Sequence, residues 1–259
     1  MDFGRRETWD EILTAKDAYD RLEELHADGT LHSVFPEITP IVGFGGLDEG
    51  HKDLWDHTKR VVSQAVPQPV VRWAALFHDV GKPKRFHRDP KTGKISFHNH
   101  EGLSASLFRA AARRTQFFTS DEAKTIEFLI RHLGHVEAYE RDWTDSAVRR
   151  LSKLIEGYTD EVLALCRADI TTRFSEKRRA HIERTNDLAR RIRELAALDA
   201  IPPALPKGLG DALMAKLGLQ PGRELGLIMN GLRGRVEAGE LPRNAEIEVY
   251  LQALVTRQQ

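Results

Sequence analysis

The sequence has little cysteine, no long apolar run and no net charge, and each of these excludes a class of protein. Cys166 is the only cysteine among 259 residues. An intramolecular disulfide and a zinc site built from several thiolates are therefore both excluded. No apolar segment approaches the roughly 20 residues that a membrane-spanning helix needs. The acidic N-terminal segment resembles neither a signal peptide nor a transit peptide. We therefore expect a soluble cytoplasmic protein with no membrane partner.

The zero net charge argues against a generic polyanion binder, but it conceals an uneven distribution along the chain. The 39 basic residues equal the 39 acidic ones in number. Residues 1–56 contain 14 acidic and five basic side chains, whereas residues 72–94 contain seven basic and two acidic ones. A hydrophobic content of 41% argues against intrinsic disorder. The basic stretch is a candidate anion-binding region, although a solvated surface loop explains it equally well.

The pattern of apolar residues predicts helix after helix and shows no convincing strand alternation, so we expect an all-α fold. The TSDE segment at 119–122 has the spacing of a capping box, and Thr144 and Thr159 are further candidate N-caps. We expect a helical neck-like segment over residues 1–50, a central helical domain over 51–200 and a helical tail over 201–259. A polar loop is expected at 84–99, and helices are expected at 7–28, 52–65, 69–79, 101–115, 119–132, 174–198, 210–217, 222–238 and 244–256.

Histidine is concentrated in one part of the chain, with eight of 11 residues between His51 and His135. Imidazole is the commonest metal ligand in proteins. Each candidate lies on or at the end of a predicted helix, so several elements can direct ligands into one cavity. Nitrogen and carboxylate donors together suit Mn²⁺, Fe²⁺, Co²⁺, Ni²⁺ or Zn²⁺ better than Ca²⁺. The candidates are His57, the adjacent pair His78 and Asp79 within HDVGK, His100, His132 and Asp169.

This order of residues resembles the HD-domain metal-dependent phosphohydrolases. The resemblance implies an all-α fold and a first metal ion held by residues matching His57, His78, Asp79 and Asp169. It also implies a second ion held by residues matching His100 and His132, with Asp79 shared between the two ions. Because all six positions are filled, we expect two divalent ions rather than one. His98 and His135 are neighbours that can replace the second pair.

A longer resemblance covers about 220 residues and is closest to the C-terminal part of bacterial CCA-adding tRNA nucleotidyltransferases. It rests on the segments GHKDLWDHT, VRWAALFHDVGKP, ISFHNHE, WTDSAVRRL, LCRADITTR and GELPRNAE. The Asp-x-Asp metal motif of the catalytic head of those enzymes is missing. We therefore expect this chain not to add nucleotides.

The resemblance implies hydrolysis of phosphoesters in nucleotides or RNA ends, most typically 2′,3′-cyclic phosphates and 2′-nucleotides. Two cations about 3.5–4 Å apart can clamp a phosphate and activate water. Asp79 and Lys82 are the expected catalytic residues, and Lys82, Arg85 and Arg173 are the expected substrate contacts. Lys82 can instead be a cation that stabilises a helix C-terminus. No obligate protein partner is expected.

Three other functions stay open at the level of sequence. The chain can be a non-catalytic module that binds tRNA or other RNA, or the separate body half of a split CCA-adding enzyme. It can also hydrolyse another substrate, such as a deoxynucleoside monophosphate or a hyperphosphorylated guanosine nucleotide.

Overall fold

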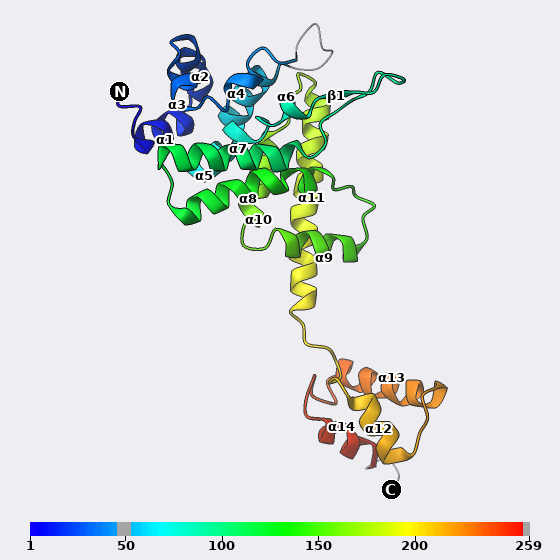
Figure 1. Cartoon of the computed structure of the whole chain (residues 1–259). Coiled ribbons are helices and arrows are strands. Elements are labelled where there is room, and N and C mark those ends of the chain that lie inside the picture. Colours follow the sequence, from blue (N-terminus) through cyan, green and yellow to red (C-terminus); the bar gives the residue numbers. More distant parts are fainter. Residues whose placement is uncertain (46–52, 256–259) are drawn as a thin grey trace. The chain divides into compact units, whose positions relative to one another are not determined.

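The structure, a computed structural model, describes residues 1–45 and 53–255. Within these ranges the chain is α-helical apart from one two-stranded hairpin, which confirms the all-α expectation (Figure 1). No helix in the described part is long and apolar enough to span a membrane. His51 and most of the glycine-rich segment at 43–50 lie outside the described residues. The elements are α1 Arg6–Thr14, α2 Ala18–Ala27, α3 Thr30–Val34, the 3-10 helix η1 Thr39–Ile41, α4 Leu54–Gln64, α5 Pro69–Phe77, α6 Lys82–Arg85, β1 His87–Arg88, β2 Ile95–Ser96, α7 His100–Thr115, α8 Ser120–Glu137, α9 Asp145–Leu154, α10 Thr159–Ala168, α11 Ser175–Asp199, α12 Leu209–Leu217, α13 Arg223–Glu237 and α14 Ile247–Val255.

The chain divides into two compact units, Met1–Arg193 and Glu194–Gln259, and the division falls inside α11. We describe each unit by itself. The limits expected from the sequence at residues 50 and 200 stay predictions.

Helix α5 is the centre of the first unit, and α1, α4, α7, α8 and α10 all pack against it. Its residues 71–77 are all buried. A helix that is apolar on every side needs partners on every side. Trp73 and Phe77 contact a cluster of aromatic rings with mostly edge-to-face geometry, which supports the packing of the surrounding helices. Because α5 is held so firmly, the residues that follow its last turn have a fixed position.

The N-terminal helix expected at residues 7–28 is in fact two helices, α1 and α2. Ala15 has an extended backbone with φ −66° and ψ 157°, which ends α1. Buried residues continue on both sides, from Trp9 to Leu13 in α1 and from Ala18 in α2. The apolar stripe therefore survives the break, and no glycine or proline marks it in the sequence.

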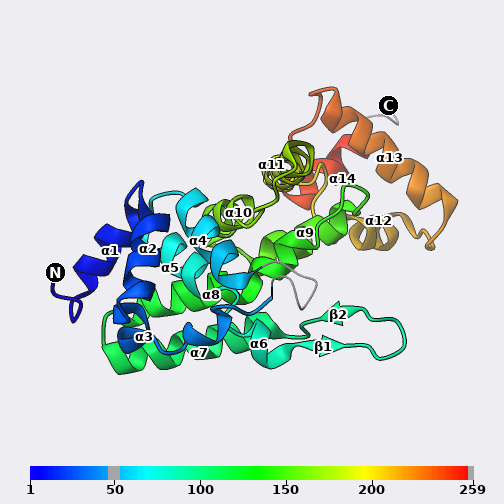
Figure 2. The same cartoon turned by 90° about the horizontal axis from the view of Figure 1, so that it is seen from above.

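The polar segment expected at 84–99 contains a short helix and an antiparallel hairpin, so the expectation of a loop without strands was wrong. His87 pairs with Ser96 and Arg88 with Ile95. The turn between the strands uses the Asp-Pro and Thr-Gly signals, and Gly93 adopts a positive φ of 68° there. Two-residue strands are too short to show the alternation of side chains that identifies a strand. Figure 2 shows the hairpin extending away from the helices of the first unit.

Two of the three predicted helix caps are confirmed. Thr119 and Glu122 form a reciprocal capping box at the start of α8, and the side chain of Thr144 accepts from the backbone of Ala147 at the start of α9. Thr159 is not a cap, because Tyr158 occupies the N-cap position of α10 and the Thr159 hydroxyl donates to the carbonyl of Ile155.

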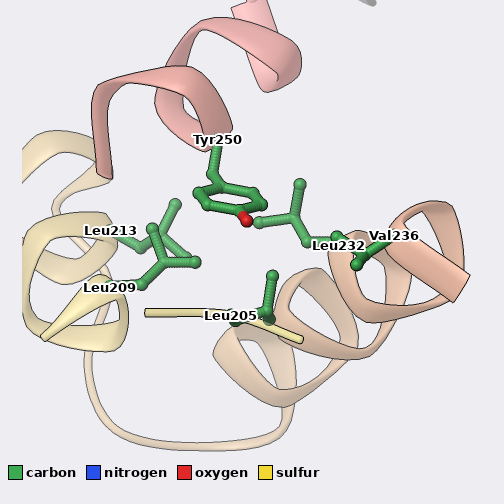
Figure 3. Packing of buried hydrophobic residues seen from close by; sticks show 6 residues of the cluster. All are labelled: Leu205, Leu209, Leu213, Leu232, Val236 and Tyr250. Atoms are coloured by element: carbon green, nitrogen blue, oxygen red, sulfur yellow. The ribbon is translucent and has the colours of Figure 1, made fainter. Parts of the chain in front are cut away.

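The second unit has its own small core, formed by α12, α13, α14 and the segment that precedes them. In Figure 3 the ring of Tyr250 lies among the leucine side chains of α12 and α13. Its hydroxyl donates to the carbonyl of Pro242 and accepts from the backbone of Ala245. The buried members of this core are Leu205, Leu209, Leu213, Leu232, Val236 and Tyr250.

We predict that Glu122→Gln lowers the free energy of unfolding by about 1–2 kcal/mol at pH 7. The carboxylate accepts from Arg6 of α1 as well as from Thr119, and the hydrogen bond with Arg6 lowers the pKa of Glu122 to about 2. A lowered pKa stabilises the fold above pH 4.5, and this contribution is lost as the pH falls towards 2. Urea unfolding of the wild type and Glu122→Gln between pH 7 and pH 3 measures the difference in their free energies of unfolding. This difference should become smaller as the pH falls. The exposed Asp121→Asn change in the same turn is the control. An equal, pH-independent loss in both variants would contradict the prediction.

Candidate metal centre

Three helices of the first unit direct histidine and aspartate side chains to one buried point. His57 lies in the second turn of α4, and His78 and Asp79 follow the last turn of α5. Asp169 follows the last turn of α10, where its backbone N–H donates to the carbonyls of Leu165 and Cys166. The sequence therefore places two of the ligand elements at helix C-termini that pack together in the core.

The polar atoms of this cluster lie at distances suited to a single cation. Asp169 Oδ1 is 3.0 Å from His57 Nε2 and 3.1 Å from His78 Nε2. The two Nε2 atoms are 3.2 Å apart. Asp79 Oδ2 is 3.3 Å from His78 Nε2 and 3.5 Å from His57 Nε2. His78 and Asp79 are only 2% and 1% exposed. Burial of this kind requires the carboxylates to be compensated by positive charge.

The tautomer of His78 bears on whether the cluster has a hydrogen-bond donor at its centre. His78 Nδ1 lies 2.7 Å from the carbonyl oxygen of Ala75, and because a carbonyl only accepts, Nδ1 carries the proton. When this ring is neutral, as a metal ligand must be, its Nε2 presents a lone pair to the carboxylates. His57 Nδ1 is 2.8 Å from the hydroxyl of Thr171, which leaves its Nε2 facing the same point. With both Nε2 atoms unprotonated, Asp169 Oδ1 is buried without a hydrogen-bond donor among residues 1–45 and 53–255. Lone pairs that converge on a point without a donor fit a metal ion, oriented by hydrogen bonds from the far side of each ring.

Asp79 also contacts two groups on the other side of the cluster. Lys82 Nζ lies 2.6 Å from its Oδ2, and His100 Nε2 lies 3.4 Å from its Oδ1. The Nδ1 of His100 donates to the carbonyl of Phe97, so its Nε2 again faces a carboxylate as a lone pair. The two oxygens of Asp79 thus face different histidines, which is the placement a shared ligand needs.

The charges of the cluster balance one another in the absence of a metal ion. Burial opposes ionisation of Asp79, but His78 and Lys82 outweigh it and hold its pKa well below the usual range. Burial likewise opposes protonation of His78, but Asp79 and Asp169 outweigh it and raise its pKa. The pKa of Lys82 is also raised, since Asp79 outweighs its desolvation. The site therefore attracts positive charge, which a proton or a metal ion can supply.

Gly81 allows α7 to approach closely enough to bring His100 to Asp79. A Cβ atom at this position would lie 2.5 Å from the carbonyl oxygen of His100 and 2.9 Å from the backbone nitrogen of Ser104. The backbone N–H of Gly81 donates to the hydroxyl of Ser104, which fixes the approach. The glycine of HDVGK is thus required by packing between a turn and a helix.

Glu137 belongs to the cluster and was missed by the sequence analysis. It hydrogen-bonds with Asp169 and lies close enough to Asp79 and His78 to interact with their charges. Burial and the negative charge of Asp169 raise the pKa of Glu137 well above the usual range, which favours its protonated form. A signal was present in the sequence, because Glu137 continues the stripe formed by the buried Ile130 and Leu133 of α8. A glutamate in a core-facing stripe indicates a buried acid.

Three other predicted residues form no hydrogen bond or ion pair with the two aspartates in the described part of the chain. His132 contacts the rings of Phe128 and His135, and its Nδ1 is buried without a partner among the described residues. Arg85 is exposed at the end of α6. Arg173 is exposed and lines a cavity of about 450 Å³ that His57 also lines. The structure therefore brings five of the six predicted ligands into one connected cluster and leaves His132 outside it.

A family model for the HD domain matches residues 54–173. These residues include every predicted metal ligand. The chain contains an HD domain. HD domains bind divalent metal ions, and His57, His78 and Asp169 form a site of matching donors in this one.

The same HD-containing chain is homologous to tRNA nucleotidyltransferases over about nine tenths of its length, as the resemblance indicated. It is 29% identical over 247 residues to the A-adding tRNA nucleotidyltransferase of Deinococcus radiodurans, covering 93% of this chain and 56% of that protein. It is 28% identical over 236 residues to the CC-adding tRNA nucleotidyltransferase of Thermus thermophilus, covering 89% and 51%. The multifunctional CCA protein of Legionella pneumophila is 30% identical over 111 residues, covering 41% and 26%. The chain thus spans about half the length of the first two relatives.

We predict that Mn²⁺ or Ni²⁺ raises the melting temperature of the HD domain. An ion at a free concentration of about 100 times its Kd stabilises the folded state by roughly 2.7 kcal/mol. For a domain of this size, this corresponds to an increase in melting temperature of about 5–10 °C. The His78→Ala and Asp169→Asn variants should lose the shift, because both remove a buried ligand. Differential scanning calorimetry after removal of bound metal measures it. The control is His87→Ala, which removes an exposed histidine of β1 that is not a predicted ligand. An equal shift in all variants would place the ion elsewhere.

Proposed function

We propose that the HD domain is a metal-dependent phosphohydrolase for nucleotides or RNA ends, with 2′,3′-cyclic phosphodiesterase and 2′-nucleotidase or phosphatase activity. The observation that carries this proposal is the convergence of histidine lone pairs and buried carboxylates beside a lysine. The HD family match supports the general class of metal-dependent hydrolases. The preference for cyclic phosphates rests on the resemblance alone.

The proposed assignment gives each side chain of the cluster a task. His57, His78, Asp79 and Asp169 would hold the first divalent ion, and Asp79 with His100 and His132 would hold a second. A divalent cation at this point polarises a phosphoryl group and makes water a better nucleophile. Mn²⁺, Ni²⁺, Co²⁺, Fe²⁺ and Zn²⁺ all accept this donor set.

Lys82 supplies the positive charge that the reaction needs near phosphorus. Its ammonium group now neutralises Asp79 at 2.6 Å and is partly exposed, so it can turn to a non-bridging phosphate oxygen once a cation takes over that carboxylate. Contact with the developing charge then favours the transition state. Glu137, which holds a proton beside Asp169, is a further candidate for proton transfer in this site.

We predict that the full chain hydrolyses 2′,3′-cyclic AMP with Mn²⁺, Ni²⁺ or Co²⁺, and that Asp79→Ala lowers kcat/KM by roughly 100-fold or more. The loss follows because this carboxylate lies within 3.5 Å of nitrogen atoms of His57, His78, His100 and Lys82. The rate is measured by separating and quantifying the product by chromatography at successive times. Asp160→Asn, an exposed aspartate in the first turn of α10, is the matched control and should keep its activity. Absence of hydrolysis with every one of the five ions would overturn the proposal, as would full activity of Asp79→Ala.

A second function, binding of tRNA without hydrolysis, is favoured by the homology to two tRNA nucleotidyltransferases. In this case the chain serves as an RNA-binding body, either alone or as half of a split enzyme. It predicts binding that weakens steeply with salt, because phosphate contacts release counterions. Filter binding of tRNA at several salt concentrations should then give the same Kd, within about two-fold, for the wild type and Asp79→Ala. Salt-independent binding, or none, would exclude this second function.

A further inference from the structure

A cavity opens directly beside the predicted metal ligand His57. It has a volume of about 450 Å³, which is within the range of small-molecule sites. One wall is α4, and the other is the segment that connects Asp169 to α11. The lining residues are Asp56, His57, Arg60, Thr171, Thr172, Arg173 and Phe174.

The segment that forms the second wall is tied to the cluster by hydrogen bonds. The side-chain amide of Gln64 donates to the carbonyls of Ala168 at 3.0 Å and Ile170 at 3.4 Å. The hydroxyl of Thr171 lies 2.8 Å from His57 Nδ1. These hydrogen bonds attach the chain to α4 both before and after Asp169. The distance between the two walls is therefore fixed. A ligand in the cavity would be held at a defined distance from His57.

Phe174 lines this cavity and is exposed to solvent over 52% of its surface. Single exposed apolar residues are common and need no function by themselves. The position and the neighbours of this ring are different, however. The guanidinium carbon of Arg173 lies 5.3 Å from the ring centroid, and Lys177 Nζ lies 5.2 Å from it. An aromatic face and two cations thus occur together beside a predicted metal ligand.

The charges around the cavity favour binding of an anion near Arg173. Arg60 is neutralised by Asp56, with Nε 2.8 Å from a carboxylate oxygen. Arg173 forms no ion pair within residues 1–45 and 53–255, so its charge is available to a ligand. A nucleotide presents both features that match this wall, namely a flat base for the ring and a phosphate for the cations.

We propose that Phe174 is the stacking platform for the nucleobase of the substrate, with Arg173 against the sugar or phosphate. This inference rests on the proposed function and narrows its substrate to phosphoesters that carry a base. Stacking on an aromatic side chain accepts every base, because each has a π face. The site therefore selects nucleotides over base-less sugar phosphates and discriminates little among the four bases.

The test is equilibrium binding of two probes to the full chain in EDTA, where no turnover occurs. The probes are 2′-AMP, which carries a base, and ribose 5-phosphate, which does not. Phe174→Ala should weaken binding of 2′-AMP by roughly 5- to 100-fold, the range expected for loss of one stacking contact. It should change binding of ribose 5-phosphate by less than about two-fold. Phe174→Trp should restore binding of 2′-AMP.

Saturation-transfer NMR gives a second readout that locates the base. The H2 and H8 protons of adenine should receive saturation from aromatic side chains in the wild type and lose it in Phe174→Ala. Leu154→Ala, which truncates another exposed apolar side chain of the first unit, is the matched control and should behave as the wild type.

The outcomes separate this inference from the proposed function. Equal binding of 2′-AMP by the wild type and Phe174→Ala would overturn it, as would absence of 2′-AMP binding by the wild type, even if 2′,3′-cyclic AMP is hydrolysed. Conversely, a base contact that depends on Phe174, found without hydrolysis in the presence of any of the metal ions, would support the stacking platform. The same result would contradict the proposed phosphohydrolase activity.

Discussion

Two aspartates buried at the ends of two helices set the constraint on which this HD domain depends. Asp79 follows α5 and Asp169 follows α10, so each carboxylate lies near the negative end of a helix dipole. The carboxylates and the dipoles add negative potential at one point away from water. Such a point is stable only if positive charge is held there. Without a metal ion, His78 supplies part of this charge, because Asp79 and Asp169 raise its pKa and so favour the protonated ring.

The groups around the cluster follow from this requirement. Lys82 approaches Asp79 because its ammonium group compensates a carboxylate that has almost no contact with water. Glu137 keeps its proton because a third ionised carboxylate beside Asp169 would add to the same charge. Gly81 is needed because α7 must come close enough for His100 to face the remaining oxygen of Asp79. Packing and electrostatics therefore point to one arrangement.

The sequence predicted the part of this arrangement that is carried by distinctive residue types. His78 and Asp79 are adjacent at the end of an apolar helix, and this pattern together with the resemblance located five residues that the structure brings together. Glu137 was missed because glutamate on a long helix is usually solvent-exposed, and its burial depends on how α8 packs against its neighbours. The break at Ala15 was missed for a related reason. An apolar stripe can continue across two helices, and residues 15–17 separate them here, with an extended backbone at Ala15.

His132 shows most clearly why side-chain type does not determine participation in a site. It lies on α8, one and a half turns before Glu137, yet the glutamate contacts Asp169 and the histidine contacts aromatic rings. Positions five residues apart on a helix point in directions that differ by about 140°. A second ion held as proposed by Asp79, His100 and His132 would use the Asp79 Oδ1 atom, which lies 3.4 Å from His100 Nε2. In that proposal His132 would join the ion from α8, where its ring lies against those of Phe128 and His135.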